Sequence, residues 1–133
     1  MPKEYVNPPS LFPSQDNGFS QAVAASGTRT LYVSGQTAWD ANRQLVGTGL
    51  ADQAKQALRN VQTAVEASGG TVDDVVSLRI YIVDYRPEKA EAVGSALRDC
   101  FSGRGKPATT WIGVGSLADP GFLIEIEATA VLD

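Results

Sequence analysis

The stretch Leu123–Leu132, close to the end of this 133-residue chain, alternates strictly between two kinds of side chain. Every second position is apolar, and the positions between them hold two acids, a threonine and a valine: the first set is Ile124, Ile126, Ala128 and Ala130, the second Glu125, Glu127, Thr129 and Val131. Successive side chains of a strand point to opposite faces of a sheet. The stretch therefore predicts a strand with its apolar set on one sheet face and its carboxylates on the other.

Two acids on one face of an otherwise apolar strand need a reason. A second extended segment is predicted at Ala108–Val114, and a short loop joins it to the first in a hairpin-like unit. An acid such as Glu125 on this face is either functional or part of a structural pair with a cation such as Arg79 or with a partner subunit. Glu127 lies one pleat further along, and we interpret it as a solvated or paired acid.

A chain of this length is expected to form one domain, so residues 1–133 are taken as a single unit that can bury a core without covalent staples. Cys100 is the only cysteine, which excludes a disulfide framework within the chain and fits a reducing compartment. The N-terminal residues have no signal-like apolar run, and no apolar run approaches the length of a membrane span. We therefore expect a soluble, cytoplasmic protein that does not bind membranes.

The chain contains no histidine, which removes the commonest general base, the Ser-His-Asp triad and nearly all zinc sites with histidine ligands. Any chemistry has to use carboxylates, hydroxyls, arginine or lysine, backbone amides and water, and we expect no metal. The net charge is −4, and the 11 basic residues are scattered without a basic stripe. Binding to nucleic acid is therefore disfavoured.

The remaining patterns predict the other elements of the chain. In order, these are an irregular lead-in over residues 1–18, strands at Ser20–Ala25, Thr30–Thr37 and Val75–Val83, and helices at Leu50–Ala67 and Pro87–Phe101. Both helices carry apolar residues at helical spacing. The four-residue link Ser26–Arg29 has the length of a hairpin loop, so we expect the strands on either side of it to be antiparallel neighbours.

This order of elements indicates an α+β fold, a mixed and mostly antiparallel sheet with two amphipathic helices packed on one face. The opposite face would then be polar and partly aromatic, and its predicted members are Ser34, Gln36, Arg79, Tyr81, Thr109, Trp111, Glu125 and Glu127. Such a face is too polar for a monomer core, and it holds more aromatic surface than a solvated face needs. We expect other subunits to cover part of it and to leave wet clefts between them.

Several motifs, in this order and spacing, resemble the reactive-intermediate deaminase (Rid) family, also called YjgF-like or L-PSP endoribonuclease-like. They are Ser34-Gly35-Gln36, the helix Ala51–Gly70, VVSLRIYIVD over Val75–Asp84, PATTW from Pro107 and IEIEATAV from Ile124, and the resemblance covers about residues 17–132. It implies a chorismate-mutase-like fold and homotrimers with three clefts between subunits, each holding a small-molecule ligand. It also implies hydrolysis of reactive enamines and imines to keto acids and ammonia without a metal or organic cofactor.

The resemblance also assigns site residues. Glu125 matches the glutamate that positions the attacking water, and Phe19 matches the aromatic residue that closes the cleft. Ser34 and Gly35 match the segment that lines the pocket. Catalytically competent members have a carboxylate-binding arginine where this chain has Thr109, and Trp111 stands where many members have a small residue or cysteine.

A threonine cannot neutralise a carboxylate, so the resemblance leaves two readings of the site open. Either the substrate is not a small 2-imino acid, or another cation replaces the arginine. Arg79 is the local candidate for a substrate-binding cation. Arg104 and Lys106, in the loop before Thr109, are further candidates. We interpret Cys100 as a buried, inert thiol.

Three functions remain as hypotheses from the sequence. The first is a cofactor-independent hydrolase of small imines, enamines or related C–N metabolites with a diverged site, in which Glu125 orients water. The second, motivated by Thr109, is a trimer that binds a small metabolite without turnover. The third, an endoribonuclease or translation inhibitor, is disfavoured by the acidic charge balance and the lack of histidine.

Overall fold

The computed structural model describes residues 3–103 and 105–133, which form a four-stranded sheet, a separate two-stranded ribbon and two α-helices. The strands are β1 (Lys3–Val6), β2 (Ala22–Ala25), β3 (Arg29–Gln36), β4 (Val75–Val83), β5 (Ala108–Val114) and β6 (Ile124–Leu132). The helices are α1 (Leu50–Ala67) and α2 (Ala90–Cys100), with short 3-10 turns at Ser14–Asn17, Val72–Asp74 and Pro87–Lys89. The helix predicted from Pro87 thus starts as a 3-10 turn and continues as α2.

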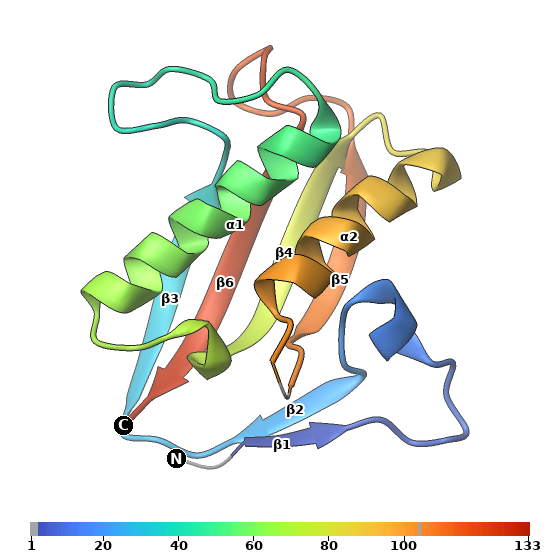
Figure 1. Cartoon of the computed structure of the whole chain (residues 1–133), viewed down its shortest axis with the longest axis vertical. Coiled ribbons are helices and arrows are strands. Elements are labelled where there is room, and N and C mark those ends of the chain that lie inside the picture. Colours follow the sequence, from blue (N-terminus) through green and yellow to red (C-terminus); the bar gives the residue numbers. More distant parts are fainter. Residues whose placement is uncertain (1–2, 104) are drawn as a thin grey trace.

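The main sheet has the strand order β3-β6-β4-β5. β6 is antiparallel to both of its neighbours, and β4 runs parallel to β5. Both helices cover the same face of this sheet, and the two-stranded ribbon lies beyond one end of it (Figure 1). The prediction of an α+β fold with a mixed, mostly antiparallel sheet and two helices on one face is confirmed.

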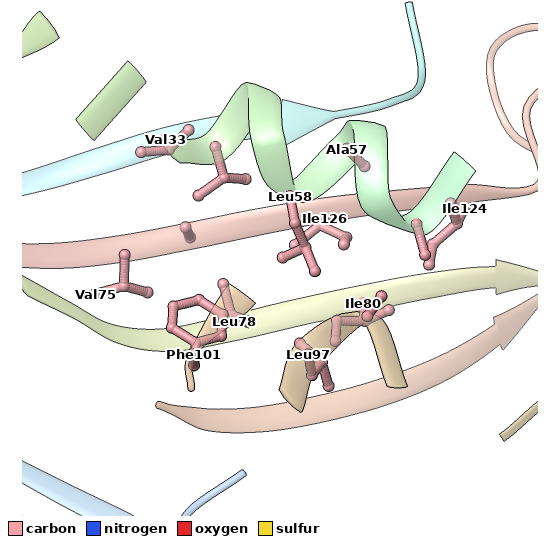
Figure 2. Close-up of a cluster of buried hydrophobic side chains, with 14 of the residues drawn as sticks. Val33, Ala57, Leu58, Val75, Leu78, Ile80, Leu97, Phe101, Ile124 and Ile126 are labelled. Carbon is pink, nitrogen blue, oxygen red and sulfur yellow. The ribbon is translucent and has the colours of Figure 1, made fainter. Parts of the chain in front are cut away.

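The core lies between the sheet and the two helices. Leu58 of α1 and Leu97 of α2 are at most 2% exposed and point toward Ile126 and Ile80 of the sheet (Figure 2). Burying such side chains contributes about 1.5–3 kcal/mol each. Both helices are amphipathic, and within the described part of the chain no helix is long and apolar enough to cross a membrane.

β6 has the alternation that its sequence predicted, because its even-numbered residues are all buried and its odd-numbered residues are half-buried. Glu125 and Glu127 therefore lie on the face that the helices leave open. This strand is the centre of the arrangement, since β3 and β4 both pair with it.

Three predicted features of the chain path are wrong. The lead-in contains a strand, β1, and it is β1 that pairs with β2, in the register Lys3 with Ala25. β2 does not pair with β3, because the link between them crosses from the ribbon to the main sheet, where Thr28 N–H donates to the Leu132 carbonyl at 2.9 Å. Finally, β5 and β6 do not form a hairpin, because β4 lies between them.

A buried glutamine of α1 holds the loop that leads into β6. Gln53 is 1% exposed; its side-chain amide donates to the Gly121 carbonyl at 3.0 Å and accepts from the Leu123 N–H at 2.9 Å. Both polar groups of the side chain are thus satisfied inside the protein, as burial requires. The contact fixes the start of the strand that carries Glu125.

Candidate functional site

Glu125 lies against the backbone of Gly35 on the open face of the sheet. A Cβ atom placed on Gly35 would be 2.0 Å from Glu125 Oε2 and 2.7 Å from its Cδ, so only glycine leaves room for the carboxylate in this position. A cavity of about 290 Å³ opens here, and its lining residues are Gly35, Tyr81, Leu117, Glu125 and Glu127. We call it the carboxylate cavity, and it brings together two of the predicted site residues, Glu125 and Gly35.

Tyr81 links β4 to the second acid of this cavity. Its hydroxyl donates a short hydrogen bond to Glu127, while across the strands Tyr81 is paired with Glu125. The bond to Glu127 is the main reason that the pKa of Tyr81 is raised, with burial and the negative charge of Glu127 acting in the same direction and Arg79 against them. Tyr81 therefore stays a hydrogen-bond donor at neutral pH. The sequence placed it on this face but did not identify it as a site residue.

A second cavity, of about 310 Å³, lies at the edge of the sheet. Its lining residues are Phe12, Asn17, Phe19, Tyr85, Ala90, Thr109 and Trp111, and we call it the aromatic cavity. The Phe19 ring is 6.3 Å from the Trp111 ring and 6.0 Å from the Phe12 ring. The cavity thus contains three of the predicted site residues, Phe19, Thr109 and Trp111.

The N-terminal segment reaches this edge because it pairs with β5. Ser20 forms an isolated parallel bridge with Ala108, and its N–H donates to the Pro107 carbonyl at 3.0 Å. Phe19 is thereby held next to the start of β5. Within the cavity, the Trp111 indole N–H donates to the Thr109 hydroxyl at 3.1 Å, which fixes the two side chains relative to each other.

The expectation that Thr109 and Trp111 share a sheet face with Glu125 is wrong. In the parallel pairing of β4 with β5, Thr109 lies opposite Leu78 and Trp111 opposite Ile80, and both of those partners point into the core under the helices. Residues paired across neighbouring strands share a face. The face of Glu125 therefore has the alternate residues of β5, and one chain holds its predicted site residues in two places.

Arg79 belongs to neither cavity. It pairs with Glu127 on β6 and with Thr110 on β5. It lines a third cavity of about 290 Å³ further along the open face, with Tyr32, Val33, Ser77, Glu127, Ala128 and Thr129. Within one chain, Arg79 does not take the place of an arginine at position 109.

Of the other cations named from the sequence, Lys106 does not fill that place. Lys106 donates to the Phe101 carbonyl at 3.0 Å, at the end of α2. Arg104 lies outside the described residues. Ser34 is exposed on β3, where its carbonyl accepts from the Gln36 side chain at 3.1 Å, and it lines neither the carboxylate cavity nor the aromatic cavity.

Sequence reasoning missed Phe12 and Tyr85, which line the aromatic cavity. Tyr85 follows Asp84, whose φ of +50° turns the chain sharply at the end of β4. Lys89 holds this turn by donating to the carbonyls of Val83 and Asp84. No periodicity marks such a turn, but the Asp84-Tyr85-Arg86-Pro87 stretch between a strand and a helix was a place to look for a loop with a function.

Metal and thiol chemistry have no support in the described part of the chain. No group of three or more Cys, Asp or Glu side chains there could hold a metal ion. Cys100 is half-buried, and burial raises the pKa of its thiol to about 11, which keeps it protonated and unreactive at neutral pH. The carboxylates, hydroxyls and aromatic rings of the two cavities are the chemistry that remains.

The chain is similar to proteins of known sequence and structure. A 2-iminobutanoate/2-iminopropanoate deaminase from Dermatophagoides farinae is 32% identical over 133 residues, covering 99% of this chain and 98% of the relative. The human protein of the same name is 35% identical over 114 residues, covering 85% of this chain and 79% of the relative. Both of these curated relatives thus carry the name of an imine deaminase.

Two crystal structures have the same α+β fold, which confirms the expected chorismate-mutase-like architecture. YyfB from Yersinia pestis, a Rid-family protein of unknown function, matches with a TM-score of 0.95 and 41% identity over 99% of this chain and 100% of its own. Rv2704 from Mycobacterium tuberculosis, of the YjgF/YER057c/UK114 family, matches with a TM-score of 0.68 and 31% identity. The match covers 98% of this chain and 100% of Rv2704. The model of the family described as Endoribonuclease L-PSP matches residues 11–132. This chain therefore belongs to the Endoribonuclease L-PSP family, which is also known as the Rid or YjgF family.

Proposed function

We propose that this protein is a cofactor-independent hydrolase of small imines or enamines, with Glu125 as the residue that positions water. The observation that carries the proposal is the Glu125 carboxylate itself, which is held over Gly35 at a cavity large enough for a small molecule. Relatives named as 2-iminobutanoate/2-iminopropanoate deaminases, at 32–37% identity, support the reaction class.

The chemistry needs one base, one proton donor and water. Water held by Glu125 attacks the carbon of the C=N bond; a C–O bond forms, the π electrons move to nitrogen, and the carboxylate takes the proton that water loses. The nitrogen is protonated, the C–N bond then breaks as the new hydroxyl loses its proton, and a carbonyl compound and ammonia leave. An enamine first takes a proton on carbon to become the imine. Glu125, protonated in the first step, returns that proton to the nitrogen, and the Tyr81 hydroxyl, whose own proton is donated to Glu127, can accept a hydrogen bond beside this path.

The complete site requires a second copy of the chain. The carboxylate cavity and the aromatic cavity lie on opposite faces of one sheet, and β4 separates the strands that carry them. Members of this family typically form homotrimers, and the open face exposes Tyr32 at 79%, an aromatic surface that a partner would cover. In our proposal each cleft joins the carboxylate cavity of one subunit to the aromatic cavity of the next.

Ammonia release from 2-iminopropanoate and from imines without a carboxylate tests the proposal. Glu125→Gln is expected to abolish turnover while the protein keeps its trimeric mass and thermal stability. Glu88→Gln, an exposed acid on the 3-10 turn before α2, is the matched control and keeps activity. Turnover by Glu125→Gln at the wild-type rate, or no turnover of any imine by the wild type, would contradict the proposed function.

A trimer that binds a small metabolite without turnover is the second candidate. The observation that favours it is the aromatic cavity, which has a threonine in place of the arginine that the family resemblance leads one to expect. Saturable binding of a ligand whose decay rate stays unchanged would support this reading. Catalysis that disappears with Glu125→Gln would exclude it.

A further inference from the structure

We propose that the aromatic cavity selects imines that carry an aromatic or apolar group and no carboxylate. This inference rests on the proposed function, because it names the substrate class of the same site. The described residues that line the cavity are neutral, and their polar side-chain groups are the Asn17 amide, the Trp111 indole N–H and the hydroxyls of Tyr85 and Thr109.

The walls of the cavity fit a flat, apolar group. The Phe19 ring lies between two others. Its centroid is 6.0 Å from that of Phe12 at an interplanar angle of 71°, and 6.3 Å from that of Trp111 at 53°. Tilted and edge-on contacts of this kind are the geometry that aromatic rings prefer. Phe12 is 56% exposed and Tyr85 36%, so both retain apolar surface that a bound ring would cover. A further ring would continue the same packing.

No lining side chain of the aromatic cavity is charged among the described residues. The cations of the neighbouring segments are engaged: Lys89 donates to backbone carbonyls, and Arg98 donates to a carbonyl and to a carboxylate. Arg86 lies 3.4 Å from the Asp84 carboxylate. A carboxylate drawn from water into this cavity would lose hydration without gaining a charged partner.

Two backbone N–H groups at the start of α2 are already bonded and so do not replace a cation at this place. Ala90 lines the cavity at the start of α2, where free N–H groups would attract an anion. Its N–H, however, is bonded to the Pro87 carbonyl, and the Lys89 N–H is bonded to the Arg86 carbonyl at 2.9 Å. The 3-10 turn before the helix has used these donors.

Thr109 supplies one neutral hydrogen bond. Its oxygen accepts from the Trp111 indole, which leaves the hydroxyl proton available for a ligand. A neutral donor of this kind satisfies an imine nitrogen or a carbonyl oxygen, as do the neutral donors of Asn17 and Tyr85, whereas a carboxylate is held best by a charged partner.

The carboxylate cavity acts in the same direction. Among the described residues its lining includes Glu125 and Glu127 and no cation, while Arg79 beside it pairs with Glu127 across the strands. Two carboxylates repel an anionic substrate and attract the protonated form of an imine, which is the form that water attacks more readily. Both halves of the proposed cleft therefore disfavour a substrate carboxylate, which sets this protein apart from a 2-imino acid deaminase.

Binding of two inert probes tests the selectivity without any turnover. Benzamide and benzoate share a ring but differ in charge, and calorimetry on the full-length protein measures both. We expect benzamide to bind at least about 10-fold more tightly, a ratio that corresponds to 1.4 kcal/mol. Trp111→Ala and Phe12→Ala should each weaken benzamide binding. Phe12 is exposed, so its replacement leaves the core intact. Leu45→Ala, at an exposed residue elsewhere, is the control and should not change benzamide binding. Equal or tighter binding of benzoate would overturn the inference.

Turnover separates this inference from the proposed function. Benzaldimine and 2-iminopropanoate are compared by kcat/KM, and we expect benzaldimine to be preferred. Preference for 2-iminopropanoate would overturn the inference and leave the proposed function standing. Tight benzamide binding with no turnover of either imine would remove the proposed function and leave the cavity as a binding site for neutral aromatic molecules.

Discussion

Replacing Gly35 by alanine would displace the Glu125 carboxylate without unfolding the protein. The added Cβ would lie 2.0 Å from Glu125 Oε2, whereas Cβ atoms essentially never approach another heavy atom below 3.0 Å. The oxygen therefore has to move by about 1 Å, because it belongs to the flexible end of a side chain, whereas Gly35 is backbone held between the paired residues Val33 and Gln36, where the strand pairing is irregular.

A shift of this size is large for catalysis and small for stability. Misplacing a catalytic group by about 1 Å costs on the order of 100-fold in rate. The backbone of Gly35 is not in the left-handed region, so alanine adds no strain there, and replacing glycine inside a strand gains roughly 0.5–1 kcal/mol of conformational entropy. We expect kcat to fall about 100-fold while the free energy of unfolding changes by less than about 1 kcal/mol.

Steady-state ammonia release and chemical denaturation measure the two quantities on the same preparation. Gly115→Ala is the matched control, because a Cβ there would have no heavy atom within 4 Å, and it should keep both activity and stability. The reasoning is refuted if Gly35→Ala retains the wild-type kcat while Glu125→Gln is inactive, because the position of the carboxylate would then not matter.

Three further predictions concern stability and reactivity. Gln53→Met should lower the free energy of unfolding by about 1–3 kcal/mol, because the Gly121 carbonyl and the Leu123 N–H lose their hydrogen-bond partner. Hydrogen exchange of the Leu123 amide should accelerate, and an unchanged exchange rate would argue against the role of Gln53. Burial by itself would raise the pKa of Asp74, but hydrogen bonds from a backbone N–H and from Lys3 outweigh it and lower that pKa from 3.8. The ionised Asp74 therefore stabilises the folded state above about pH 4, and this stabilisation is lost as the pH falls through the lower pKa of the folded protein. Asp74→Asn should flatten the decline in unfolding free energy between about pH 5 and pH 2. Because the pKa of Cys100 is about 11 instead of 9.0, a disulfide reagent at about pH 8 should label the folded protein about 100-fold more slowly than the unfolded chain, and equal rates would contradict this.

Much of the fold could be predicted, because each of its central elements has only one face that is apolar enough to be buried. The range Val75–Val83 was predicted as a strand and Leu50–Ala67 as a helix, with the bounds that the structure has. In β6 only one of the two strand faces can be buried, because the other has Glu125 and Glu127. In β3 the same reasoning put Gly35 on the apolar face with Leu31 and Val33, and only the family resemblance assigned it to the pocket; the irregular pairing between Val33 and Gln36 breaks that alternation.

The pairing of β2 could not be predicted, because it depends on contacts far away in the sequence. A Cβ on Gly27 would lie 2.6 Å from the Leu132 carbonyl oxygen, so the chain crosses the end of β6 at this link instead of reversing. β2 then meets β1, which Lys3 anchors to Asp74 at 3.1 Å. Neither contact leaves a local pattern.

The face of Thr109 could not be predicted because β5 has no clear alternation. Thr109 and Thr110 are identical, and Trp111 is followed by Ile112, so either face of this edge strand is equally apolar. Only the pairing with β4 decides which residues of β5 face the helices, and it turns Trp111 toward the core. Family resemblance named residues that line both cavities, such as Glu125 in one and Thr109 in the other, but their assignment to one sheet face came from an ambiguous pattern.

The two-faced arrangement has a consequence that subunit mixing can test. Neighbouring strands are about 4.8 Å apart, so β5 and β6, with β4 between them, are about 10 Å apart, and Thr109 and Glu125 point to opposite faces. No single small imine can touch both in one chain. Thr109→Phe, which fills the aromatic cavity, and Glu125→Gln should each be inactive, yet trimers assembled from both variants should regain activity.

The size of this recovery follows from the assembly. In a trimer of equal and random composition, each cleft takes one half from each of two neighbouring subunits, so about one quarter of the clefts combine two intact halves. Co-expression of the two variants with different tags, followed by selection of mixed trimers, should therefore yield on the order of a quarter of the wild-type activity or more. Mixed trimers of the correct mass that stay inactive would show that Glu125 and Thr109 do not serve one cleft, and the two cavities would then have to be assigned separate roles.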